Sequence, residues 1–323
     1  MQTVSQYNQY SQHQANHGNI KKIGIGVVSS SLLSREEHLF DRLEEKYILS
    51  EEILPKILER VEARMLPSYN GHDVRYSLIE STYYDSPRLE FFRHHLLSLP
   101  VRYKMRIRKY APGGEWDNDC LYFEVKKKEL EKTRKVRFAM SREDLWALEQ
   151  GIVPECSEKL LQLNPKLSPE KLAKRVYKAQ ELFKSFDTIP VVRIGYRRRA
   201  YELNEFRITI DSGLSSEFLF PKECAKNQLQ LKDHIFSEVL SEAGSIATMK
   251  DNWIADPVII NKMQEIIQKI ETKNIVVMET KCGEGEVFPP WMQEMLAEFN
   301  LVKTPFSKYC HFTAEMVSKM FLG

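Results

Sequence analysis

The chain has 323 residues, of which 42% are hydrophobic and 28% are charged, and its formal net charge is +2. This length suffices for one large domain or two small ones with a buried core. The nearly balanced charge excludes a global positive field of the kind that coats nucleic acid. Basic residues instead concentrate locally, with 12 Lys and Arg against 6 Asp and Glu between Arg102 and Arg137. This local excess indicates a focused anion site.

The five cysteines are scattered and form no C-x-x-C pair or zinc-ligand spacing, which is typical of reduced thiols in a cytosolic protein. The longest apolar stretch, residues 23–33, is too short to span a bilayer and lacks the basic start of a signal peptide. We therefore expect a cytoplasmic protein without a membrane segment of its own, although a separate membrane partner would be compatible with the sequence.

The first half of the chain predicts a tail followed by strands and short helices. Residues 1–34, rich in Gln, Asn, Ser and His, are expected to be disordered and to precede one domain over 35–323. A helix is expected over 51–65, with Ser50 as its N-cap. Another helix is expected near 89–97, and a third begins after Ser141. The alternating segments predict strands at 42–49, 76–84, 101–110, 119–128 and 132–139.

The second half mixes helices with three further strands. Residues 141–186 are expected to be mainly helical, and strands are expected at 190–202, 205–211 and 275–281. Residues 215–273 look like a helical insertion, and a helix over 291–299 precedes a terminal helix. Strands interrupted by helices predict the α+β class.

Five of the predicted strand segments carry charge at every second residue. Because alternate side chains of a strand point to opposite faces, each segment has one charged and one apolar face. This pattern predicts a sheet or barrel whose charged face converges on a polyanion such as a phosphate chain. The segments are Glu44-x-Lys46, Lys104-x-Arg106-x-Arg108, Glu124-x-Lys126-x-Lys128, Arg207-x-Thr209-x-Asp211 and Glu279-x-Lys281.

Eight motifs between about residues 40 and 312 resemble, in family order, the VTC (vacuolar transporter chaperone) domain. This domain is the polyphosphate polymerase branch of the triphosphate tunnel metalloenzymes, within the CYTH-like superfamily. The motifs are Glu44-Glu45-Lys46-Tyr47, Tyr83-Tyr84-Asp85-Ser86, Lys104-Met105-Arg106-Ile107-Arg108, Phe123-Glu124-Val125-Lys126-Lys127-Lys128, Pro190-Val191-Val192-Arg193 with Tyr196-x-Arg198, Arg207-Ile208-Thr209-Ile210-Asp211, Met278-Glu279-Thr280-Lys281 and Phe306-Ser307-Lys308-Tyr309.

The resemblance implies a closed, mostly antiparallel β-barrel with a basic lumen, surrounded by helices. It also implies roles for individual residues. The phosphate-gripping, catalytic residues would be Lys46, Arg106, Arg108, Lys126, Arg198, Arg207, Lys281 and Lys308. Further substrate-binding residues would be Tyr196, Lys128, Lys104 and Arg134. A divalent metal, Mn²⁺ or Mg²⁺, would be held by Glu279, with Glu44 and Glu124 as additional candidates.

The activity implied by the resemblance is transfer of the γ-phosphoryl of ATP to a growing polyphosphate chain. Such phosphoryl transfer depends mainly on positioning and on stabilisation by fixed cations and a metal. Hydrolytic relatives carry Glu-x-Glu-x-Lys, whereas Arg42 stands at the first Glu position here, which favours the polymerase branch. The expected partners are ATP and inorganic polyphosphate.

Several alternatives remain open from the sequence. The same fold could hydrolyse triphosphate or polyphosphate, or the chain could be a non-catalytic polyphosphate-binding module. A nucleic-acid binder is the least favoured, because few aromatic residues interleave the basic strands. Period alone does not decide between Tyr196 with Arg198 and the opposite face of their strand. Glu279 could pair with Lys281 instead of a metal, Lys308 could be a helix-cap residue, and Lys127 is expected to be exposed.

Overall fold

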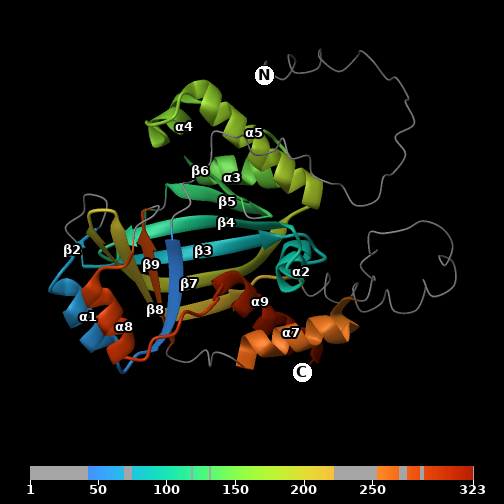
Figure 1. The fold of residues 1–323 in the computed structure, drawn as a ribbon. Helices are drawn as coiled ribbons and strands as arrows, with labels where there is room; N and C mark the ends of the chain where they lie inside the picture. Colours follow the sequence, from blue (N-terminus) through green and yellow to red (C-terminus); the bar gives the residue numbers. More distant parts are fainter. Residues whose placement is uncertain are drawn as a thin grey trace, which may run out of the picture.

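The computed structural model describes residues 43–68, 75–117, 119–130, 132–221, 253–268, 275–283 and 287–322 (Figure 1). The predicted tail over 1–34 and residues 222–252 and 269–274 of the predicted insertion lie outside this description. Nine strands of the described chain form one antiparallel sheet, and helices lie on both of its faces. The α+β class expected from the sequence is therefore confirmed.

The sheet has the strand order β1-β9-β8-β7-β3-β4-β5-β6, and β2 pairs separately with β7. Within the described ranges no ladder joins β6 to β1, so the strand pairing itself leaves the sheet open between these two edges. The strands are β1 (Leu43–Ser50), β2 (Leu66–Pro67), β3 (Ser77–Asp85), β4 (Val101–Pro112), β5 (Leu121–Glu129), β6 (Lys132–Met140), β7 (Ile189–Leu203), β8 (Phe206–Phe218) and β9 (Ile275–Cys282).

The helices of the described residues are short, apart from α5. None of them is both long and apolar enough to cross a membrane. They are α1 (Leu54–Glu62), α2 (Glu90–Leu96), α3 (Arg142–Glu149), α4 (Glu158–Leu163), α5 (Pro169–Phe186), α7 (Pro257–Gln268), α8 (Pro290–Glu298) and α9 (Lys308–Val317), with the short turns η3 (Trp253–Ala255) and η4 (Ser318–Leu322).

Two groups of helices cover what we call the outer face of the sheet. Helices α3, α4 and α5 cover β4, β5 and β6, with Phe123 and Leu172 fully buried between them. Helices α1 and α8 cover β1, β8 and β9, where Met278 and Met292 are buried together. The apolar residues of the alternating strands therefore point outward, under helices, as their period predicts.

Helices α2, α7 and α9 pack at the opposite, inner face of β3 and β7. Neighbouring residues of β3 show the alternation directly. Tyr83 stacks on Tyr309 of α9, with ring centroids 5.1 Å apart, whereas Tyr84 contacts Phe183 of α5. Helix α9 is thus buried against the same face that carries the charged residues of the strands.

The sequence signals for helix starts predict one N-cap correctly and another incorrectly. Ser141 caps α3 in a reciprocal capping box with Asp144, as expected. Ser50, in contrast, ends β1, and α1 begins after Ile53, which makes no side-chain cap. Residues 215–218, which the sequence predicts to be part of the helical insertion, instead extend β8 to Phe218.

Candidate functional site

Strand register gathers the predicted charged residues on the inner face. Lys104 lies opposite Lys126, and Arg106 lies opposite Glu124, in the β4–β5 ladder. At the other end of the sheet, Glu279 lies opposite Lys46, and Lys281 lies between Glu44 and Arg207. Three connected charge clusters can be distinguished on this face.

The first, the Glu124 cluster, surrounds one carboxylate with four cations. Glu124 lies 2.6 Å from Arg106 Nη2, 3.4 Å from Lys135 and Arg137, and 3.6 Å from Arg108, and its side chain is only 3% exposed. Burial disfavours the charged carboxylate, but Arg106 and Arg108 outweigh burial and hold the pKa of Glu124 well below its ordinary value. Glu124 therefore fixes the guanidinium groups in place.

The second, the two-carboxylate cluster, contains Glu44, Glu279, Lys46 and Lys281. Lys281 Nζ lies 2.8 Å from Glu279 and 3.3 Å from Glu44, while Lys46 Nζ lies 3.5 Å from Glu44 and 3.9 Å from Glu279. Burial opposes ionisation of Glu279, but Lys281 and Lys46 hold its pKa at about 2. Both carboxylates are therefore anionic at neutral pH and lie beside each other.

The third cluster joins β7, β8 and α9 through Asp211. Arg198 donates two hydrogen bonds to Asp211, of 2.6 and 2.7 Å, and Lys308 Nζ donates one of 2.6 Å. The ring of Tyr196 lies under both cations, 4.8 Å from Lys308 Nζ and 5.4 Å from Arg198. Lys308 is thus an inner-face cation, and the N-cap role falls to Ser307, which accepts from Cys310 N–H.

The start of α9 is anchored beside this cluster by a buried carboxylate. Asp85 accepts hydrogen bonds from the hydroxyl of Tyr309 and from the backbone N–H groups of Phe91 and Phe92. Burial raises the pKa of Asp85 to about 7, although these donors act in the opposite direction. Tyr83, which stacks on Tyr309, accepts a hydrogen bond of 3.0 Å from Arg106. This chain of contacts links α9 to the Glu124 cluster.

Two inner-face lysines have no ion pair with any described carboxylate. Lys104 and Lys126 face each other across β4 and β5. Burial, together with Lys46, Lys126 and Arg106, lowers the pKa of Lys104 to about 8 against a smaller opposing effect of Cys310. Lys126 lies close enough to Glu44, on the far end strand β1, for the two groups to influence each other's ionisation. The sheet therefore curls until β1 and β5 face the same space.

Most predicted site residues lie on this face. Tyr196 and Arg198 are its β7 members, which resolves the ambiguity of that strand, since Arg193 instead pairs with Glu217. Lys128 follows Lys126 on the same side of β5. Arg207 lies at the margin, 42% exposed and 3.3 Å from Glu202.

Two predictions on the basic strands are corrected by the register. Arg134 lies opposite Lys127, on the outer face with Val125 and Val136, so it lies apart from the inner-face clusters. Lys127 is on the outer face as expected, but it is 1% exposed rather than solvated. It lies over the ring of Tyr103 and pairs with Glu129 at 3.1 Å, which compensates for its burial.

Sequence reasoning assigned no site role to several inner-face residues, among them Tyr83, Lys135 and Arg137, and it placed Asp211 on the charged face without giving it a role. Lys135 and Arg137 share one face of β6, because they alternate with the buried Val136. The alternation Thr133-x-Lys135-x-Arg137 was visible in the sequence, whereas the pairing of β6 with Glu124 became visible only in the sheet.

The three predicted metal ligands do not lie together. Within the part of the chain that the structure describes, no three His, Cys, Asp or Glu side chains gather as a metal site. Glu279 is close enough to Glu44 to oppose its ionisation, whereas Glu124 belongs to its own cluster. Two carboxylates fit an Mg²⁺-type ion that takes its remaining ligands from phosphates and water.

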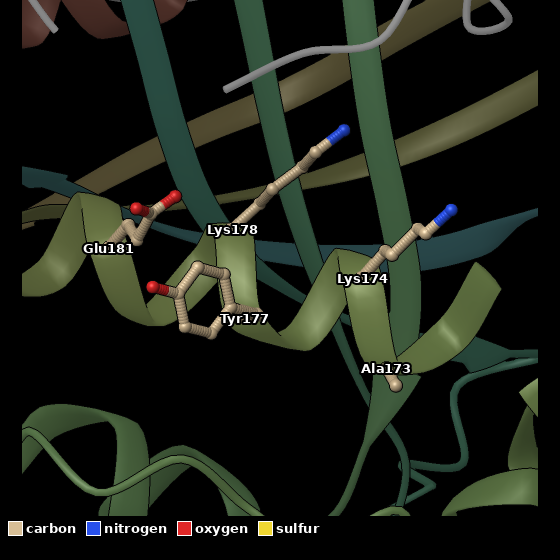
Figure 2. A pocket seen from close by; sticks show the side chains of 5 residues that line it. All are labelled: Ala173, Lys174, Tyr177, Lys178 and Glu181. Carbon is tan, nitrogen blue, oxygen red and sulfur yellow. The ribbon is translucent and has the colours of Figure 1, made fainter. Parts of the chain in front are cut away.

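A surface hollow of about 480 Å³ lies elsewhere, along α5 (Figure 2). It is lined by Ala173, Lys174, Tyr177, Lys178 and Glu181. Since α5 covers the outer face of β4–β6, this hollow is separate from the inner-face clusters.

Fold and site together define a class of protein: an α+β chain with a curved antiparallel sheet that gathers cations and carboxylates on its inner face. The VTC domain family model matches residues 41–317. The chain belongs to this family, which confirms the resemblance carried by its motifs. No curated protein matches the chain.

Similar solved structures show a distant likeness. A provisionally assigned adenylate cyclase from Bacillus halodurans has 10% identity and a TM-score of 0.41, covering 87% of this chain and 97% of that one. A protein from Pyrococcus horikoshii has 11% identity and a TM-score of 0.38, with 85% and 99% covered. A provisionally assigned adenylate cyclase from Vibrio parahaemolyticus has 8% identity and a TM-score of 0.36, with 84% and 97% covered.

Proposed function

We propose that this chain is a polyphosphate polymerase that transfers the γ-phosphoryl group of ATP to a growing polyphosphate chain. The observation that carries the proposal is the inner face itself, where Lys104 and Lys126 form no ion pair with a carboxylate of the described residues, although Glu44 and Glu279 lie side by side on the same face. Unpaired, partly desolvated cations favour a ligand with several negative charges, and phosphate chains have that chemistry.

In the proposed reaction, an oxygen of the acceptor chain attacks the γ-phosphorus of ATP. The bond between the γ-phosphorus and the bridging oxygen breaks, and ADP leaves with the electron pair. Arg106 and Arg108, which Glu124 fixes, would bind phosphate oxygens through their planar N–H groups. Lys308 and Arg198 would stabilise charge from the α9 side, since both are held by Asp211.

Glu44 and Glu279 are the residues that would hold Mn²⁺ or Mg²⁺. Their two oxygen-bearing side chains suit a hard cation, and such an ion would neutralise charge on the phosphates. Lys46 and Lys281 now occupy the space beside these carboxylates and could turn to phosphate oxygens when the metal binds. Glu124, already surrounded by four cations, is not part of this proposed metal set.

We further propose that the sheet functions as a tunnel around the polyphosphate. The electrostatic contact between Glu44 on β1 and Lys126 on β5 supports this geometry, because five strands separate these residues in the sheet order. A cytoplasmic location fits a supply of ATP and is part of the same proposal.

The proposal is tested by incubating the purified protein with γ-labelled ATP and Mn²⁺ and resolving the labelled products on a gel. We expect a ladder of chains from the wild type, and its loss in the Glu279→Ala variant. Glu298→Ala is the matched control, because Glu298 forms an exposed ion pair with Arg60 on α1.

Other products would contradict the polymerase. Label found only in orthophosphate would identify a hydrolase of the same fold. Retention of added polyphosphate without turnover in Mn²⁺ or Mg²⁺ would identify a binding module.

A further inference from the structure

The inner face changes character along β4 and β5. On β4, the residues facing inward run from Lys104 through Arg106 and Arg108 to Tyr110. On β5, the corresponding series ends at Tyr122, which lies opposite Arg108. Cations therefore occupy one end of this stretch, and two tyrosines occupy the other.

The two tyrosines form an organised aromatic group with Arg137 of β6. Their rings meet edge to face, with centroids 5.3 Å apart. The Arg137 guanidinium lies 4.3 Å from the centroid of Tyr122 and 5.5 Å from that of Tyr110. Arg108 donates a hydrogen bond of 3.2 Å to the hydroxyl of Tyr110.

The side chains of this aromatic group are held in place by their contacts but remain partly exposed to solvent. Arg137 lies 3.4 Å from the buried Glu124, which holds its guanidinium, yet 39% of its side chain is exposed. Tyr110 and Tyr122 are each partly exposed. Directly opposite Tyr122, Ala139 on β6 contributes only a methyl group. Flat aromatic and guanidinium surfaces with some access to solvent are the surfaces on which nucleobases stack.

We propose that Tyr110, Tyr122 and Arg137 form the site for the nucleobase of the phosphoryl donor. The inference rests on the proposed function, because it takes a nucleoside triphosphate as the phosphoryl donor. It goes further by stating at which end of the inner face the nucleoside binds. Tyr110 is four strand residues from Arg106, a span of about 13 Å at the usual rise. A ribose and the first phosphates would bridge that interval, with the terminal phosphates among Arg106, Lys104 and Lys126.

The order of aromatic and cationic side chains along the inner face matches the order of base and phosphates in a nucleoside triphosphate. The base would contact the tyrosines and Arg137, and the triphosphate would extend along β4 toward the lysines. The polyphosphate acceptor, which has no base, would need only the cationic stretch. The aromatic group should therefore distinguish a nucleotide from inorganic polyphosphate.

The test compares two ligands in calorimetric titrations with Mg²⁺: a non-hydrolysable ATP analogue and inorganic tripolyphosphate. Tyr122→Leu should weaken binding of the analogue by at least about fivefold, the lower end expected for loss of base stacking. Binding of tripolyphosphate should change by less than about twofold, since no phosphate-binding cation is removed. Tyr122→Phe should keep the affinity for the analogue.

Two controls distinguish a loss of base stacking from a general effect of the substitution on folding. Tyr177→Leu, on the outward side of α5 (Figure 2), should alter neither affinity. Wild-type protein should also bind the ATP analogue more tightly than a base-free ribose triphosphate, a comparison that needs no variant.

Two outcomes would overturn the inference: equal weakening of both ligands by Tyr122→Leu, or no preference of the wild type for the ligand with a base. Chain synthesis and base preference can fail separately. A protein that makes no polyphosphate but prefers the nucleotide retains the base site, and a polymerase without that preference retains only the proposed reaction.

Discussion

The Glu124 cluster and the two-carboxylate cluster differ in their ratio of cations to carboxylates and in how deeply the carboxylates are buried. The first places four cations around one carboxylate that is 3% exposed. The second places two carboxylates, 32% and 17% exposed, beside two lysines of 30% and 37% exposure. A buried carboxylate with short guanidinium contacts is a fixed part of the fold, whereas partly exposed ion pairs can exchange for a metal and phosphates.

The two clusters therefore have different roles on the inner face. The Glu124 cluster holds side chains in fixed positions, whereas the two-carboxylate cluster can exchange its ion pairs for ligands. Glu124 gives the guanidiniums their positions before any ligand binds, so those positions cost nothing to organise during binding. Glu44 and Glu279 pair with lysines that are partly exposed, so these lysines can change partners. The comparison predicts that charge removal harms stability in the first cluster and ligand chemistry in the second.

The largest effect is expected for Glu124→Gln. Neutralising this carboxylate leaves Arg106 and its neighbours without their buried counter-charge, which should cost about 3–5 kcal/mol of unfolding free energy. Urea denaturation measures the change. Glu298→Gln, at an exposed pair with Arg60, should cost less than ~1 kcal/mol. Similar small losses in both variants would show that Glu124 is not a structural counter-ion.

Glu279→Gln should chiefly affect the metal. We expect Mn²⁺ affinity in the presence of tripolyphosphate to fall by at least about tenfold, since even groups that only support metal ligands contribute ~10–100-fold. Titration followed by electron paramagnetic resonance measures free Mn²⁺. Unaltered Mn²⁺ binding would remove Glu279 from the metal site and leave it as a partner of Lys281.

The ion pairs of Glu279 should also make the stability of the ligand-free protein depend on pH. The pKa of Glu279 is held at about 2, below its ordinary 4.5. Its contribution to stability is therefore present above pH 4.5 and is lost as the pH falls toward 2. The stability difference between wild type and Glu279→Gln should shrink by on the order of 1 kcal/mol between about pH 5 and pH 3. A difference that stays constant with pH would contradict this assignment.

The smallest effect concerns Lys104, which has no described carboxylate partner. Its pKa is lowered to about 8, so the side chain loses its charge as the pH rises through that value. Tripolyphosphate affinity should consequently fall by about threefold between pH 7 and 9, the scale of one partly screened charge interaction. Lys104→Arg, which stays charged, should reduce this pH dependence. An equal dependence in both proteins would assign it to another group.

Strand parity explains how much of this face could be predicted. Alternation within a strand places Arg106 and Arg108 on one side and Met105 on the other, whichever strand lies next to them. The same rule would have placed Arg134 outside and Lys135 and Arg137 inside, once the face of β6 was set by its pairing with β5. That pairing depends on the assembled sheet.

The roles of the glutamates could not be separated in this way. Glu44, Glu124 and Glu279 each precede a lysine by two residues, so their local patterns are the same. What distinguishes Glu124 is the neighbouring strand β6, which contributes Lys135 and Arg137. Likewise, the burial of Lys127 follows from Tyr103 on β4, a contact that charge density along the sequence does not indicate.

The pairing of β1 with β9 has a consequence for biosynthesis. Lys46 meets Glu279 across this ladder, although more than two hundred residues separate them in the chain. A ribosome must therefore deliver β9 before the two-carboxylate cluster can exist, and α9 must follow before Lys308 reaches Asp211. Such distant pairing is slow and leaves edges exposed. A translation product that stops early would present a basic, unfinished sheet to cellular polyanions, and engagement of α9 would mark its maturation.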